Sequence, residues 1–222
     1  MIMERKIYFL KVETYVLGPV MTNCYFAINE DTKETLIIDP ANSADIIKQN
    51  LNKEALKPVA ILLTHGHFDH IFAAAEIASD FQIPIYASKE EIELLGTPSL
   101  NLSPSIGENI SLSPTNLLSD NDVLKLAGME VNVIYTPGHT SGGVCYLFKE
   151  SKILFTGDTL FEGTVGRADL PTSNLNALLD SLNRKLMKLP DDITVFPGHG
   201  GSTTIGNERN TNPYVTQGGS FK

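Results

Sequence analysis

The sequence predicts an α/β sandwich, in which two β-sheets pack together and helices cover their outer faces. Short runs rich in β-branched residues alternate with helix-like segments along the 222 residues, and the two halves share this order of strands followed by a helix. No shift in composition marks a linker between the halves. We therefore expect residues 1–222 to form a single domain.

The first half is expected to open with an antiparallel meander, because turn residues separate three strand-like runs at 14–18, 23–28 and 35–39. Four elements should follow: a helix after an Asn-Ser cap, a strand, a helix with apolar residues at spacings of three and four, and another strand. They are expected at 43–52, 59–63, 71–81 and 83–87.

Residues 97–121 are rich in Pro, Ser, Asn and Gly, so we expect a long ordered loop or a cover of short helices there. The second half then carries four strand candidates, at 131–135, 143–148, 152–155 and 193–196. A helix is expected at 174–189, before the last of these strands.

Composition and charge exclude several classes of protein. The net charge of −9 opposes binding to nucleic acid, and no apolar run is long enough to span a membrane. The first twenty residues carry five charges and lack the long apolar core of a secretory signal. A cytoplasmic location is therefore expected.

The histidines gather at the ends of the predicted strands. The chain has five, and three of them lie in the stretch THGHFDH, residues 64–70. The other two, His139 and His199, follow strands in PGHT and PGHG, and Asp158 follows a strand in TGDT. Loops carried on a rigid scaffold usually place binding groups in this way. The pattern indicates a metal site.

The spacing within the cluster indicates a loop, because on a helix His65 and His67 would point about 200° apart. Residues two apart in a tight loop can converge on one ion, while Asp69 and His70 face a second. Five imidazoles and two carboxylates exceed what one ion takes from a catalytic site with an open position. Two metal ions are therefore expected.

These four motifs, in the chain order THGHFDH, PGHT, TGDT and PGHG, resemble the metallo-β-lactamase fold hydrolases and most of all their glyoxalase II-like branch, over about residues 15–212. The resemblance implies an αββα sandwich with a binuclear site at one edge. It implies that one ion is held by His65, His67 and His139, the other by Asp69, His70 and His199, and that Asp158 bridges them. It also places Asn23 and Asp39 in the family's pattern, as supports of the site loops.

The chemistry implied is hydrolysis, in which a hydroxide held between the two ions attacks a carbonyl carbon and Asp69 takes or relays a proton. Mixed nitrogen and oxygen ligands suit zinc, with iron or manganese as alternatives. Asp158 argues against the lactamases, which resemble this scaffold but lack the bridging aspartate.

The substrate expected is a small-molecule thioester similar to S-lactoylglutathione. Arg167 stands at the position of the family's basic residue that contacts the thiol carrier, and its alternative is an ordinary arginine paired with Glu162 or Asp169. Asp169 replaces the family's nearby tyrosine, and because only 23 residues follow His199 here, we expect no helical C-terminal domain of the kind that grips glutathione. A different thiol preference is therefore expected, as in the short single-domain bacterial members, in a monomer or homodimer.

Two other functions stay open. A persulfide dioxygenase keeps the same cluster but uses a single iron, held by residues matching His65, His139 and Asp158. The second is a metal protein or binding partner without hydrolytic activity.

Overall fold

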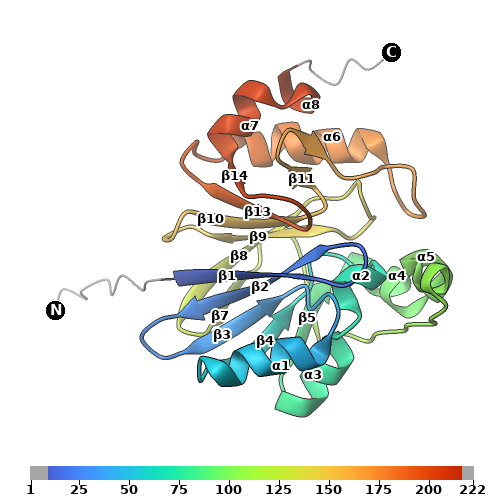
Figure 1. The fold of residues 1–222 in the computed structure, drawn as a ribbon. Helices are drawn as coiled ribbons and strands as arrows, with labels where there is room; N and C mark the ends of the chain where they lie inside the picture. Colours follow the sequence, from blue (N-terminus) through green and yellow to red (C-terminus); the bar gives the residue numbers. More distant parts are fainter. Residues whose placement is uncertain (1–9, 217–222) are drawn as a thin grey trace.

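The computed structural model describes residues 10–216 and shows two mixed six-stranded sheets packed face to face. Helices α1 and α3 cover the outer face of one sheet, and α6 and α7 lie beyond the other (Figure 1). The predicted αββα sandwich is therefore confirmed.

The first sheet has the order β1-β2-β3-β4-β5-β6, with strands Leu10–Leu17, Thr22–Asn29, Glu34–Ile38, Lys57–Leu62, Ile85–Ser88 and Asn116–Leu118. Its first three strands are antiparallel, which confirms the meander, and β3 to β6 run parallel. The second sheet has the order β14-β13-β10-β9-β8-β7. Its strands, from β7, are Val123–Leu126, Met129–Tyr135, Val144–Phe148, Ile153–Gly157, Thr194–Pro197 and Thr203–Thr204. A hairpin of β11 and β12 stands apart, at Leu160–Phe161 and Thr164–Val165.

The helices are mostly short. From α1 to α8 they are Ala44–Lys53, Phe68–Ile71, Ala74–Phe81, Ile92–Gly96, Pro98–Asn101, Leu175–Arg184, Ile205–Thr211 and Pro213–Thr216. Short 3-10 helices stand at Lys89–Glu91, Ser103–Ile106 and Leu186–Lys188.

Alternation along the strands divides the apolar residues into three clusters. In β2, Tyr25 and Ala27 face the second sheet, whereas Phe26 and Ile28 pack with the apolar residues of α1 and α3. A third cluster joins the outer face of the second sheet to α6. Burial on both faces explains why the central strands read as continuous apolar runs in the sequence.

Three predicted helices differ in detail from those observed. The helix expected over 71–81 begins only at Ala74, as α3, and the separate helix α2 ends at Ile71. Between them the Ala73 N–H donates to the Pro40 carbonyl (3.0 Å) instead of joining a helical ladder. Ser43 does precede α1, but its side chain makes no capping hydrogen bond. The helix expected at 174–189 ends at Arg184.

Several short elements were not predicted. Residues 97–121 do contain short helices. Near the end of this segment lies the strand β6, which was not predicted and pairs with β5 through Tyr86 and Asn116. The strands β7, β11, β12 and β14 and the last two helices were also missed. Most of these are edge or hairpin pieces of two to four residues, too short for a periodic pattern.

Residues 1–9 and 217–222 lie outside the described part of the chain, so the expectation about a secretory signal rests in part on residues that are not described. Among the helices of residues 10–216, none is both long and apolar enough to cross a membrane.

Candidate metal centre

Four strands from both sheets bring the candidate ligands to one edge of the sandwich. His65 follows β4, His139 follows β8, Asp158 follows β10 and His199 follows β13. The sheets are joined at this edge, because the Val144 N–H donates to the Thr64 carbonyl (2.8 Å). Placement at strand ends, predicted from the sequence, is therefore what the structure shows.

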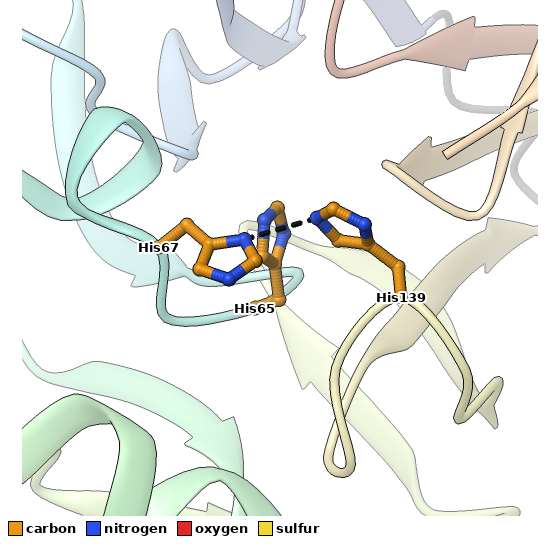
Figure 2. A group of neighbouring side chains, drawn as sticks. All are labelled: His65, His67 and His139. Carbon is orange, nitrogen blue, oxygen red and sulfur yellow. Dashed lines mark hydrogen bonds between the residues drawn. The ribbon is translucent and has the colours of Figure 1, made fainter. Parts of the chain in front are cut away.

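His65, His67 and His139, here called the histidine group, turn their rings toward one another (Figure 2). His67 Nδ1 lies 2.9 Å from His139 Nε2, and all three residues are buried. His65 and His67 stand in the loop before α2, as the spacing predicted. Their ligand atoms lie close enough together to hold one metal ion.

Asp69, His70 and His199, here called the mixed group, form a second cluster of that kind. Asp69 Oδ2 is 3.4 Å from His70 Nε2 and 3.3 Å from His199 Nε2. His70 is fully buried, whereas the side chain of His199 is 27% exposed. The mixed group therefore reaches the surface where the histidine group does not.

Asp158 lies between the two groups. Its Oδ1 is 3.4 Å from His70 Nε2, and its Oδ2 is 3.5 Å from His139 Nε2 and 3.6 Å from His199 Nε2. One carboxylate thus faces ligands of both groups, as a bridging residue must.

The donor atoms fit divalent ions. A tetrahedral ion with bonds of about 2.0–2.1 Å separates its ligand atoms by roughly 3.3 Å, close to the spacings around Asp69 and Asp158. His65 Nε2, His70 Nε2 and Asp158 Oδ1 are buried and make no hydrogen bond to any residue that the structure describes. Since buried polar atoms are normally satisfied, these atoms indicate room for a cation.

The electrostatics differ between the groups. Burial, together with the neighbouring imidazoles, lowers the pKa of His65 well below its usual value and that of His67 to about 3. Neutral imidazole is the form that binds metal. For His70, burial opposes protonation, but three nearby aspartates raise its pKa well above the usual value. The negative potential of these aspartates would also favour a divalent ion beside His70.

Asp39 and Asn23 support the ligand loops, as the sequence indicated. Asp39 Oδ2 is 2.9 Å from His70 Nδ1 and accepts a hydrogen bond from the Thr64 hydroxyl (2.6 Å), which in turn contacts His65 Nδ1 (3.1 Å). Asn23 Nδ2 donates to the carbonyls of Pro197 and Gly200, on both sides of His199. Such contacts would orient the ring nitrogens toward a bound metal.

Two glycines permit the close approach of the ligand loops. A Cβ at Gly198 would lie 2.2 Å from Asp158 Oδ1, and one at Gly166 would lie 1.9 Å from the Asp158 carbonyl oxygen. The backbone after Gly166 also orients a candidate ligand, because His139 Nδ1 lies 2.8 Å from the Arg167 carbonyl. This leaves His139 Nε2 facing Asp158.

The side chain of Arg167 lines the cleft beside the ligands but is already paired. Its Nε and Nη2 donate to the two carboxylate oxygens of Asp169, each at 2.9 Å. The pairing that the sequence offered as the alternative is present, with Asp169 and not Glu162 as the partner, and the contact of Arg167 with a thiol carrier stays a prediction.

Glu91 is a site residue that the sequence did not reveal. It is 1% exposed, and its Oε1 accepts a hydrogen bond from the N–H of Gly66, between His65 and His67. Burial raises its pKa to about 7, against the lowering effect of the Gly66 N–H, the Thr140 hydroxyl and the Gly142 N–H. Its position becomes visible only in the fold, since it lies in a 3-10 helix with two other acidic or basic residues.

The chain belongs to the metallo-beta-lactamase superfamily, since the family model of that description matches residues 17–199. Proteins of this superfamily are generally hydrolases, which agrees with the class that the motifs indicated.

Among curated relatives, a probable metallo-hydrolase, YqgX of Bacillus subtilis, is 37% identical over 90% of this chain and 94% of its own length. Hydroxyacylglutathione hydrolase GloC of Haemophilus influenzae is 34% identical over 93% of this chain and 98% of its own.

Among solved structures, BLEG-1 B3 metallo-beta-lactamase has a TM-score of 0.89 and 39% identity, covering 93% of this chain and all of the other. TTHA1623 in a di-iron-bound form has a TM-score of 0.82 and 34% identity, covering 91% and 99%. ETHE1 from Myxococcus xanthus has a TM-score of 0.75 and 27% identity, covering 94% and 85%.

Proposed function

We propose that this protein is a binuclear metal-dependent hydrolase of acyl-thiol thioesters. The observation that carries the proposal is Asp158, whose two oxygens face the histidine group and the mixed group. The similarity to a protein named hydroxyacylglutathione hydrolase supports the thioester as substrate class.

The proposed ligands are those of the two groups, with Asp158 shared. Bound divalent ions lower the pKa of a water and polarise a carbonyl. We propose zinc, with iron as the first alternative, because a structure 34% identical to this chain is in a di-iron-bound form. Because the imidazoles of the histidine group are neutral, they would leave the positive charge of a bound ion uncompensated.

Asp69 has two proposed roles, as a ligand and as a group that takes or relays a proton. Burial raises its pKa, but His70, His199 and the Thr22 hydroxyl lower it by more, so that the carboxylate stays ionised. Thr22 Oγ1 donates to Asp69 Oδ2 (2.7 Å) and fixes the carboxylate at the cleft. An ionised, oriented carboxylate suits both roles.

In the proposed reaction water adds its oxygen to the thioester carbonyl carbon and the carbon–sulfur bond breaks. One proton of the water leaves with the thiol. The acid product is released as a carboxylate, and the second proton of the water passes to the solvent. The test is hydrolysis of S-lactoylglutathione and a panel of other acyl-thiols by purified, metal-loaded protein. Release of free thiol supports the proposal, and no release from any member of the panel overturns it.

A lactam is the competing substrate, because a structure 39% identical to this chain is titled a B3 metallo-beta-lactamase. Lactam and thioester hydrolysis share the attack on a carbonyl carbon. A chromogenic cephalosporin in the same assay distinguishes them: we expect kcat/KM for the thioester to exceed that for the lactam.

The persulfide dioxygenase is the other alternative. It needs one iron, whereas the mixed group offers a complete second set of ligands. Metal analysis with measurement of oxygen uptake on glutathione persulfide decides between them. One iron per chain together with oxygen uptake would favour the oxygenase.

A further inference from the structure

We infer that the cleft selects acyl-thiols whose remote part is apolar and uncharged, and that Leu102 is a specificity-determining residue for this choice. The inference rests on the proposed thioesterase function and names its substrate class. It is carried by the lining of the cleft, by the backbone that holds Leu102, and by the charge balance at Arg167.

The cleft next to the ligands has a volume of about 360 Å³, which is within the usual range for a small-molecule site. Apart from Arg167, Asp158 and members of the two groups, its lining is apolar and consists of Val20, Phe68, Leu102, Phe161 and Leu170. These residues come from five separate segments of the chain. A substrate whose carbonyl lies at the ligands therefore meets apolar walls with the rest of its length.

Leu102 reaches the cleft through an unusual backbone conformation. Its φ of 67° lies in the left-handed region, which few residues other than glycine adopt. The buried side chains on either side hold it there: Asn101 donates to the Ile110 carbonyl (2.8 Å), and the Ser103 hydroxyl accepts from the Ile110 N–H (3.0 Å). The fold thus retains a strained leucine at the cleft, as often occurs where a side chain serves binding.

The one cation of the lining, Arg167, offers little to an anionic substrate. Asp169 occupies two of its donors in a bidentate pair, and both side chains are 68% exposed. A substrate carboxylate approaching this guanidinium meets the negative charge of Asp169 as well. The rim of the cleft therefore does not favour a thiol carrier that bears carboxylates.

The experiment compares three lactoyl thioesters on the metal-loaded protein: those of glutathione, N-acetylcysteamine and butanethiol. We expect kcat/KM to be highest for butanethiol and lowest for glutathione, by about tenfold, since each buried CH₂ is worth about fourfold. In the variant Leu102→Asn, which tolerates the left-handed backbone, we expect a loss of about tenfold for the butanethiol ester and under about twofold for the glutathione ester.

The matched control is Ile106→Asn. Ile106 lies on the same segment and is 38% exposed, but it is not among the residues that line the cleft. It should change none of the three rates by more than about twofold, because it loses no contact with the substrate. A second variant, Asp169→Asn, should lower KM for the glutathione ester alone, by about fivefold.

Two results overturn the inference. If all three esters are cleaved, the glutathione ester is best and Leu102→Asn affects the three equally, the apolar selection is wrong while the thioesterase proposal stands. If the metal-loaded protein cleaves none of them or any other acyl-thiol, the proposed function fails and this inference fails with it.

Discussion

The histidine group and the mixed group have the same number of residues but different surroundings. All three members of the histidine group are buried, and His139 is held by the Arg167 carbonyl at 2.8 Å. In the mixed group only His70 is fully buried, and His199 Nδ1 has a distant contact with the Met21 carbonyl, at 3.4 Å. A ligand that is already oriented loses less freedom on binding a metal. We therefore expect the histidine group to bind its ion more tightly.

The largest effect is expected for Asp158→Asn, which changes the one residue shared by both groups. We expect kcat/KM to fall by about three orders of magnitude, because the clamp formed by two ions is worth several kcal/mol. Elemental analysis should show fewer than two ions per chain. A variant that keeps two ions and full activity would show that Asp158 is not a metal ligand.

His199→Ala breaks the mixed group at its exposed ligand. We expect it to keep one ion, in the histidine group, and to lose roughly two orders of magnitude in kcat/KM. His67→Ala is the companion variant, since it breaks the buried group. Chelator titration should show that His199→Ala retains its remaining ion at higher chelator concentrations than His67→Ala does. If His67→Ala retains its ion at the higher chelator concentrations, the histidine group does not bind its ion more tightly than the mixed group.

Asp39→Asn tests the contact that orients His70. The amide keeps the size of the side chain but replaces the charge next to His70 Nδ1, at 2.9 Å. We expect the affinity of the mixed group for its ion to fall by about 10-fold to 100-fold, the usual cost of losing such a partner. Competition with a metal-binding dye measures it. No change in either affinity would show that Asp39 only supports the fold.

Glu91→Gln concerns the histidine group and is expected to change the stability of the fold rather than metal affinity or activity. The pKa of Glu91 is raised to about 7 from 4.5, so the folded protein binds a proton that the unfolded chain releases. The wild type should therefore lose stability as the pH rises from about 4.5 through about 7, by up to roughly 3 kcal/mol, and the glutamine variant should not. Denaturant unfolding at a series of pH values measures the difference.

The control for this variant is Glu208→Gln. Glu208 is as buried as Glu91, but it accepts hydrogen bonds from Gly163 N–H, Thr203 and Asn212 and lies outside the ligand groups. It should destabilise the protein without removing the loss of stability between these pH values. If both variants remove it, the pH dependence does not belong to Glu91.

The candidate ligands could be predicted from the sequence because four of them directly follow strands and the other three lie within five residues of His65, a local pattern that one chain displays directly. The fold class followed from alternating strands and helices for the same reason. Asp169 as the partner of Arg167 was one of two local possibilities and needed the structure to decide.

What could not be predicted depends on partners far away in the chain. The break between α2 and α3 needs Pro40, whose carbonyl takes the Ala73 N–H. The placement of Leu102 needs Ile110, and that of Glu91 needs Gly66. The strand β6 is recognisable only beside β5, because three polar and apolar residues carry no period of their own.

The central claim is a centre of two ions held with unequal strength. It is tested most directly by removing metal stepwise from the loaded wild type with a chelator, while metal content and thioesterase activity are followed together. We predict two ions per chain that leave in two phases, with most of the activity lost in the first phase. Full activity with a single ion per chain would contradict the account.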